Sequence, residues 1–223
     1  FNQRKNVFLV GNSYANDLLN FLNHNTELKE KYYFYTAVED NFTDSMELDC
    51  FYLFLKENNK SCNFGYFSFL EKQYKESDYI IFHVKRNWFY FTSKFSEITE
   101  FLKNDKKKFI VLLDDISFAD ILDTYLMSHN KLPTNQELNE LEISFTELSK
   151  AWDRENLIKA KGKLLENNIK FIGRSELYCN YIQKKCPLIA KDEKIYSDEG
   201  HLTIYGARHL SDKGQKLINI LVN

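Results

Sequence analysis

Short, almost uninterrupted apolar runs recur along the chain and limit what it can fold into. Clear examples lie at residues 6–10, 79–84, 109–113 and 169–172, and an aromatic-rich segment at 32–38 adds another. Such runs are typical of strands buried on both faces, as in a parallel sheet covered by helices. Segments with helical spacing of apolar residues separate them. The order therefore predicts an α/β fold, a three-layer α/β/α sandwich with a parallel, flavodoxin-like sheet.

The segments between these strands indicate where the helices lie. One segment, residues 123–140, contains Pro133 and several polar residues, so we expect an insertion or a mobile loop there. The helices expected elsewhere fall at 14–24, 46–58, 71–75, 95–102, 136–168 with breaks, and 203–221 as a closing amphipathic helix.

Size and charge narrow the function classes. The 223 residues are 43% hydrophobic, enough for one large domain, and we expect a single domain over residues 1–223. The 30 basic and 32 acidic residues are well mixed, so no basic face marks a nucleic-acid partner. No apolar stretch approaches the roughly 20 residues that span a bilayer.

The four cysteines fall into two local pairs, Cys50 with Cys62 and Cys179 with Cys186. Neither pair has the CxxC spacing of a zinc site, and no histidine lies close by, so we expect no metal. Two local disulfides are our prediction, and free buried thiols are the alternative. Disulfides would place the chain in an oxidising compartment.

A serine, a histidine and an aspartate stand where one sheet edge could bring them together. Ser13 follows the first strand, whereas Asp198 and His201 are three apart just before the last helix. A serine hydroxyl needs a neighbouring base to act as a nucleophile, and a carboxylate holds an imidazole in the right tautomer. We therefore predict that Asp198 binds His201 Nδ1 and that Nε2 meets the Ser13 hydroxyl at roughly 2.6–3.2 Å.

Each of these residues also has a plainer interpretation. Ser13 could simply cap the helix that follows it, His201 could be a surface residue, and Asp198 could belong to a turn. Their joint placement favours the catalytic interpretation, and Gly200 is expected to give the turn between Asp198 and His201 its flexibility.

Polar residues at the other strands have structural interpretations as well. Asp114 and Asp115 follow a strand, and we favour capping over a metal site for them because no third ligand is in view. His83 lies within a strand and is expected to face the interior, satisfied by a neighbour.

Two short motifs resemble a known family. Gly11-Asn12-Ser13 looks like the first block of the SGNH (GDSL-like) hydrolases, and Asp198-Glu199-Gly200-His201 looks like their last block. Residues 195–207 are similar to the tail of SGNH domains fused behind acyltransferase-3 membrane domains. The two cysteine pairs and Trp88 also agree with that subgroup.

The resemblance implies roles for individual residues. Ser13 would be the nucleophile, His201 the base and Asp198 its partner, with no metal or organic cofactor. Asn87 matches the asparagine of the third family block and would be an oxyanion donor, with Trp88 beside it as a substrate-binding or core residue. The glycine of the second block has no counterpart after residues 32–38, so the Ser13 backbone N–H is the safer donor.

The resemblance also implies a function and a setting. It predicts a serine-dependent O-acyltransferase, for O-acetyl transfer, that modifies a cell-surface polysaccharide or glycan through an acyl-enzyme on Ser13. Its partners would be an acyl donor, a glycan acceptor and the membrane acyltransferase domain of the same parent chain. We expect the chain to be a domain excised from that larger protein, placed in the periplasm or on the extracytoplasmic face of the envelope.

Two alternatives remain open. One is a carbohydrate O-acetyl esterase or deacetylase of the same fold, in which water takes the acyl group. The other is a catalytically inactive SGNH-like module that binds glycan or acts as a scaffold.

Overall fold

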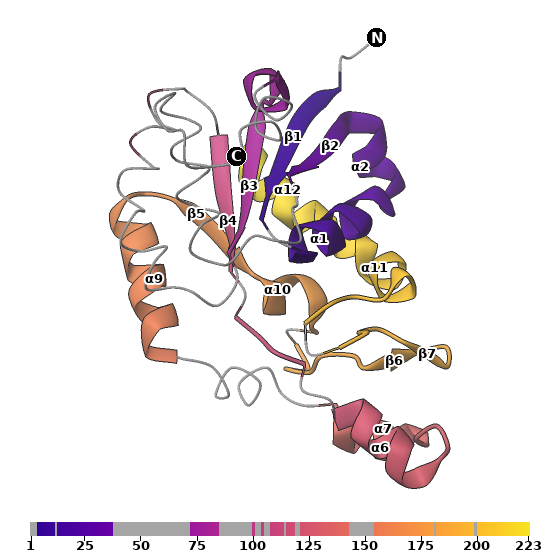
Figure 1. Ribbon diagram of the computed structural model, residues 1–223. Helices are drawn as coiled ribbons and strands as arrows, with labels where there is room; N and C mark the ends of the chain where they lie inside the picture. The colour runs from indigo at the N-terminus through magenta and orange to yellow at the C-terminus, as the bar shows by residue number, and fades with distance from the viewer. Residues whose placement is uncertain are drawn as a thin grey trace, which may run out of the picture.

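The computed structural model describes residues 4–11, 13–37, 72–84, 100, 104, 108–113, 115–118, 121–142, 154–180, 182–198 and 200–223. One parallel sheet forms its centre, in the strand order β2-β1-β3-β4-β5 (Figure 1). Its strands are β1 (Lys5–Val10), β2 (Tyr32–Ala37), β3 (Tyr79–Val84), β4 (Lys108–Leu113) and β5 (Lys170–Gly173). This is the flavodoxin-like order, so the predicted fold class is confirmed.

The inner strands are buried on both faces, as their apolar runs predict. In β1, Val7 and Leu9 belong to the core cluster that includes Leu18 and Phe21. Phe8 points to the opposite face, because side chains alternate along a strand, yet it is equally buried. Both faces of the sheet are therefore covered at β1.

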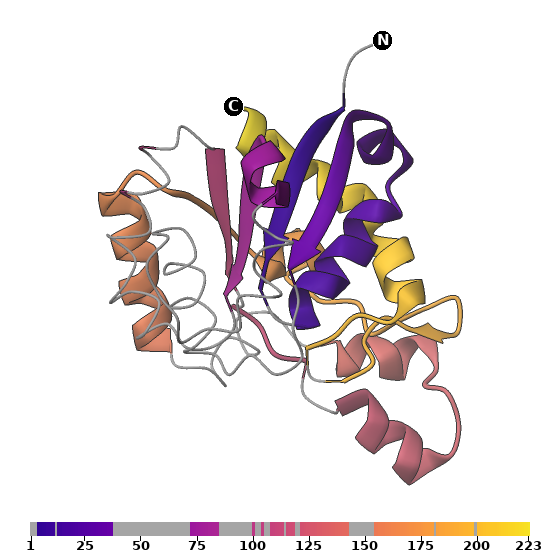
Figure 2. The same ribbon diagram turned by 45° about the horizontal axis from the view of Figure 1, so that its top comes forward.

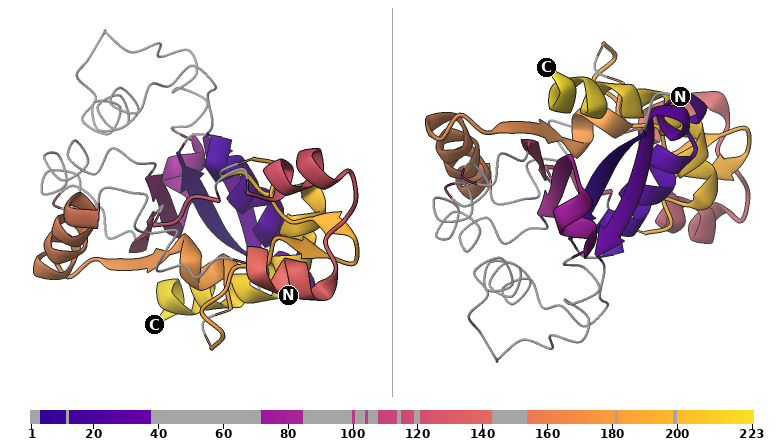
Figure 3. Two further views of the ribbon diagram at one scale, coloured as in Figure 1. Left: turned by 90° about the horizontal axis from the view of Figure 1, so that it is seen from below. Right: turned by 90° about the horizontal axis from the view of Figure 1, so that it is seen from above.

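One layer of helices packs on the face of Val7 and Leu9. It contains α1 (Ser13–Asn23), which contacts β1 and β2, and α12 (Gly214–Val222), which contacts β4 and β5. The helix α9 (Arg154–Glu166) also contacts β5, on the side away from α12, as Figure 3 shows. Shorter helices are α2 (Thr26–Lys31), one turn at residues 72–76, and α10 (Arg174–Tyr178) directly after β5.

The closing segment is not the single helix expected over 203–221. It consists of α11 (Ile204–Leu210), a 3-10 turn (Ser211–Lys213) and α12. The turn redirects the chain, so that α11 packs on α1 while α12 reaches β4 and β5. The Ser211 carbonyl accepts a hydrogen bond from the Gly214 N–H within the turn and another from the Asn25 side-chain amide at 3.1 Å, which ties the turn to the start of α2.

Of the two possibilities expected over 123–140, an insertion or a mobile loop, the mobile loop is wrong. This part of the chain forms two helices, α6 (Ile121–His129) and α7 (Asn135–Leu141), with Pro133 in the short connection between them. Thr134 caps the start of α7 with a capping box, which the sequence signals through Glu137 three residues later. The two helices lie beyond the carboxyl edge of the sheet, beside the hairpin of β6 (Ile189–Ala190) and β7 (Glu193–Lys194) (Figure 2).

The long helical stretch expected over 136–168 is divided. Its first helix, α7, ends at Leu141, and α9 begins at Arg154, with residues 143–153 outside the described parts. The helix expected at 46–58, nearly all of that at 95–102, and Cys50 and Cys62 also lie outside them. Within the described ranges, no helix has the length and apolar character needed to cross a bilayer.

Candidate active site

Ser13 is placed by the tight passage from β1 into α1. Gly11 follows β1, and a Cβ atom at this glycine would lie 2.8 Å from the carbonyl oxygen of His83 on the neighbouring strand. Only a glycine therefore lets the end of β1 approach β3 so closely. Ser13 then begins α1, partly exposed at the carboxyl edge of the sheet, where the free N–H groups of a helix start favour negative charge.

His201 sits in a small closed loop. A β-bridge between Tyr196 and Leu202 closes the loop, and the Ser197 N–H donates to the His201 carbonyl at 2.9 Å. Asp198 shapes its interior, because Oδ1 accepts hydrogen bonds from the N–H groups of Gly200 and His201, both at 2.8 Å. This is the turn-forming chemistry that an aspartate supplies from its own side chain.

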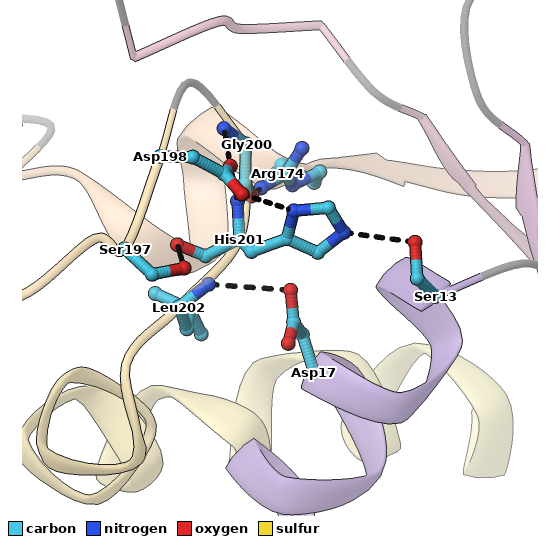
Figure 4. A network of polar contacts seen from close by, with 8 residues as sticks. All are labelled: Ser13, Asp17, Arg174, Ser197, Asp198, Gly200, His201 and Leu202. Atoms are coloured by element: carbon cyan, nitrogen blue, oxygen red, sulfur yellow. Dashed lines mark hydrogen bonds and ion pairs between the residues drawn. The ribbon is translucent and has the colours of Figure 1, made fainter. Parts of the chain in front are cut away.

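The three predicted residues form one hydrogen-bonded line (Figure 4). Asp198 Oδ2 lies 2.7 Å from His201 Nδ1, and His201 Nε2 lies 2.8 Å from Ser13 Oγ. Both predicted hydrogen bonds are confirmed. Residues 188 positions apart in sequence thus meet within direct proton-transfer distance.

The ionisation of Asp198 determines which nitrogen of a neutral His201 carries the proton. Partial burial opposes its charged form, but the N–H groups of His201 and Gly200 outweigh this and lower the pKa of Asp198. An ionised carboxylate can only accept, so Nδ1 of a neutral His201 must carry the hydrogen. Nε2 then has a free lone pair, directed at the Ser13 hydroxyl. The line can therefore draw a proton from Ser13 and hold the resulting imidazolium.

A family model described as "SGNH domain (fused to AT3 domains)" matches residues 1–214. The chain belongs to this family.

Solved structures share the fold of this SGNH domain. The periplasmic domain of the Salmonella ser. Paratyphi A lipopolysaccharide acetyltransferase has a TM-score of 0.66 at 18% identity, covering 98% of this chain and 85% of that one. The acetyl xylan esterase AlAXEase has a TM-score of 0.51 at 13% identity, covering 96% and 99%. The YXIM protein of Bacillus subtilis has 0.54 at 10%, covering 97% and 56%. No curated protein matches the sequence.

Gly200 has a different role in the SGNH domain from the one expected. None of the described glycines has a positive φ, so the turn does not depend on glycine's backbone freedom. A Cβ atom at Gly200 would instead lie 2.0 Å from the hydroxyl oxygen and 2.5 Å from a ring carbon of Tyr14. The glycine is needed because the loop lies directly on the Tyr14 side chain.

Two residues of α1 that the sequence analysis did not identify contact the histidine loop (residues 197–201) or the bridge that closes it. The Tyr14 ring stacks on the His201 imidazole, with the ring centres 4.3 Å apart and the planes 7° from parallel. Asp17, one helical turn after Ser13, accepts a hydrogen bond from the Leu202 N–H at 3.2 Å. Burial raises the pKa of Asp17 to about 6, although the nearby His201 and Arg174 oppose the shift. Helical spacing from Ser13 was the signal that could have identified Asp17.

Arg174 is a further residue that the sequence analysis missed. Its side chain is 1% exposed, and Nη2 donates to the carbonyl oxygen of Gly200 (Figure 4). The guanidinium carbon lies 4.7 Å from the centre of the Tyr14 ring. Arg174 directly follows β5, so the strand-end rule that selected Ser13 could also have identified it.

Asp115 has the capping role that we favoured. Its buried carboxylate accepts hydrogen bonds from the Ser175 N–H at 2.9 Å and the Ser175 hydroxyl at 2.7 Å, which anchors the start of α10. No cluster of potential metal ligands is found among the described residues.

The remaining candidate residues are His83, Asn87, Trp88 and Asp114. His83 is buried in β3, as expected, with its ring centre 5.4 Å from that of Tyr14. Asn87, Trp88 and Asp114 lie outside the described residues.

Proposed function

We propose that this SGNH domain is a serine-dependent O-acyltransferase that transfers an acyl group, in particular acetyl, to a cell-surface polysaccharide or glycan. The observation that carries the proposal is the line from Asp198 through His201 to Ser13, with contacts of 2.7 and 2.8 Å. Its Ser13 end lies at the start of α1, at the edge of the sheet where ligands of such folds bind.

The first half of the reaction loads the enzyme. Ser13 Oγ attacks the acyl carbon of the donor while His201 Nε2 takes the hydroxyl proton. The Asp198 carboxylate, 2.7 Å from Nδ1, stabilises the imidazolium. As the tetrahedral intermediate collapses, the bond to the leaving group breaks, and His201 returns the proton to that group. The product is an acyl ester on Ser13.

The second half transfers the acyl group. A sugar hydroxyl takes the place of the leaving group, gives its proton to His201 Nε2 and attacks the ester carbon. Collapse of this intermediate breaks the bond to Ser13 Oγ, which recovers its proton from His201. The acyl group then resides on the sugar, and the enzyme returns to its starting state.

The oxyanion of both intermediates needs hydrogen-bond donors. We propose the backbone N–H of Ser13 as one donor, because Ser13 is the first residue of α1 and helix-start N–H groups lack partners within the helix. Asn87 is proposed as a second donor and Trp88 as part of the acceptor site.

The family and one structural neighbour support an extracytoplasmic domain that works together with a membrane acyltransferase domain. Family members are fused to AT3 domains, and the Salmonella neighbour is the periplasmic domain of a lipopolysaccharide acetyltransferase. We therefore propose that residues 1–223 form one catalytic domain, tethered to a membrane acyltransferase domain of the same parent chain on the extracytoplasmic side. That domain would supply the acyl donor.

A carbohydrate O-acetyl esterase is the second candidate. The fold is shared with an acetyl xylan esterase, and the same Ser13 chemistry gives hydrolysis when water replaces the sugar hydroxyl. The two functions differ only in which acceptor attacks the acyl-enzyme.

The test compares Ser13→Ala with a control serine. Ser128 lies on α6, where its hydroxyl bonds the Thr124 carbonyl within the same helix, so Ser128→Ala should leave turnover unchanged. With p-nitrophenyl acetate as donor, Ser13→Ala should lower turnover on the order of 10⁴-fold. In the wild type, mass spectrometry should detect an acetylated peptide that contains Ser13, and this peptide should be absent from the variant. Residual activity within tenfold of wild type would refute the assignment of Ser13.

A glycan acceptor then separates the candidates. Transfer requires acetylated glycan to form at the expense of free acetate, whereas an esterase releases acetate regardless of the acceptor. A wild-type protein with neither activity would instead support the inactive binding module.

A further inference from the structure

His201 is surrounded by groups that take no part in the proposed proton transfers. The Tyr14 ring lies flat against its imidazole, and the adjoining Gly200 is in contact with the same tyrosine. Arg174 holds the Gly200 carbonyl from α10 and places its guanidinium near the Tyr14 ring. The histidine loop is thus contacted by side chains from two helices, α1 and α10.

We propose that Tyr14 and Arg174 form a clamp that fixes the His201 imidazole in the orientation that faces Ser13. The proposal rests on the proposed function for its catalytic consequence, but the clamp itself is a statement about the position of the ring. Tyr14 and Arg174 are positioning residues, because they act through His201.

The need for a clamp follows from the form of the loop. Residues 197–201 lie between bridge partners Tyr196 and Leu202, and the Asp198 side chain is about half exposed at 49%. The hydrogen bonds of Nδ1 to this carboxylate and of Nε2 to Ser13 hold two atoms of the imidazole, but they leave the ring free to rotate about the line through the two nitrogens. The stacked Tyr14 ring limits this rotation, because a rotated imidazole would push its edge into a buried ring whose centre is only 4.3 Å away.

The clamp itself has firm support. Tyr14 is 3% exposed and Arg174 is 1% exposed, so neither side chain can swing into solvent. Asp115 anchors Ser175, the residue after Arg174, and the Cys179–Cys186 disulfide follows the end of α10. The short helix that carries Arg174 is therefore held at both ends.

The stack also affects the charge on the base. An imidazolium over the face of an aromatic ring is stabilised by the negative π-surface. The charged groups around the ring are Asp198 from its own loop, Asp17 from α1 and Arg174 from α10. All three remain when Tyr14 alone is changed, so the effect of the stack can be measured separately.

The decisive comparison uses two substitutions of Tyr14. Tyr14→Phe keeps the ring, and we expect turnover close to that of the wild type. Tyr14→Leu removes it, and we expect kcat to fall about 10- to 100-fold with little change in KM, since misplacement of a catalytic group by about 1 Å costs that much. The acid limb of the pH–rate profile should move about half a pH unit lower in Tyr14→Leu and not in Tyr14→Phe.

A control on the same helix separates positioning from stability. Phe21 is fully buried in α1 and packs edge-on against Tyr178, at 5.6 Å between ring centres. Phe21→Leu should lower the melting temperature without moving the pH profile. Equal losses of activity in Tyr14→Phe and Tyr14→Leu, or an unshifted acid limb in Tyr14→Leu, would overturn the clamp.

The second arm does not depend on turnover. In a Ser13→Ala background, the ring-proton resonances of His201 should be shifted upfield by the stacked Tyr14, and Tyr14→Leu should abolish that shift while Tyr14→Phe retains it. Arg174→Lys, which keeps the charge but lacks the planar fork, should broaden these resonances as the loop loosens. Unchanged resonances in Tyr14→Leu refute the clamp. A wild type without acyl turnover refutes only the proposed function, because the resonances still decide the clamp.

Discussion

The Asp115 carboxylate and Ser175 are joined twice, through the Ser175 N–H at 2.9 Å and its hydroxyl at 2.7 Å. The contact links the chain just after β4 to the first turn of α10, and both partners are buried. Gly173 makes room for it, since a Cβ atom there would lie 2.1 Å from the Asp115 carboxylate. The position of Arg174, between Gly173 and Ser175, depends on this contact.

A double-mutant cycle measures the Asp115–Ser175 contact. We expect Asp115→Ala to lower the free energy of unfolding by about 1.5–3 kcal/mol, as for a hydrogen bond to a buried charge. Ser175→Ala should cost less, and the double variant should be more stable than the sum of the single effects predicts. Urea unfolding of the four proteins gives the coupling energy, and simple additivity would contradict this contact.

Asp198→Asn tests the proposed proton path. The amide keeps an oxygen that can accept from Gly200 and His201, so the loop should fold normally. It can also donate to Nδ1, which would leave the proton of a neutral imidazole on Nε2, facing Ser13. We expect kcat to fall by about 10³- to 10⁴-fold with an unchanged melting temperature. A loss below tenfold would mean that Asp198 does not orient the base.

Asp17 makes stability depend on pH. Its pKa in the folded protein is about 6, above the ordinary value of 3.8, because burial penalises the charged form. Well below the unfolded pKa of 3.8 both states are protonated. The folded protein loses stability as the pH rises from about 4 to about 6, and the loss levels off above that. Asp17→Asn keeps an acceptor for the Leu202 N–H but cannot ionise.

The variant should therefore gain stability relative to the wild type, by about 1–3 kcal/mol, between pH 4 and pH 7.5. Denaturant unfolding at both pH values measures the gain. Parallel pH dependence of the two proteins would show that Asp17 does not carry this shift.

The Cys179–Cys186 disulfide is present, as predicted, and closes a loop of sequence separation 7. Replacing both cysteines by serine should lower the free energy of unfolding by about 2.5 kcal/mol, the loop-entropy value for this length. Activity should fall too, because the bond holds the end of α10. The Cys50–Cys62 pairing stays a prediction, and a digest without reductant, followed by mass spectrometry, checks both crosslinks. Free thiols at Cys50 and Cys62 in protein from an oxidising compartment would contradict the predicted pairing of these two residues.

Residues that act through local patterns were identified from the sequence alone. Apolar runs located the inner strands, because a strand buried on both faces needs apolar side chains on both. The edge strand β2 is more exposed and was identified from its aromatic residues. Ser13, Asp198 and His201 stood out because strand ends and helix starts share one edge of a parallel sheet. The pair Cys179 and Cys186 was visible as a short loop.

Only the tertiary structure decided which side chains surround these residues. Tyr14 looks like an ordinary core residue in the sequence, and Arg174 is only one of several polar residues at strand ends. The stacking of Tyr14 on His201 and the contact of Arg174 with Gly200 depend on how α1 and α10 meet the loop over residues 197–201. The turn at Ser211 is likewise held by the Asn25 side chain, 186 positions away. Gly200 was identified as a turn glycine, whereas its lack of a side chain serves contact with Tyr14. Periodicity records how each segment buries its own apolar face, but contacts between segments distant in the sequence form only when those faces pack together.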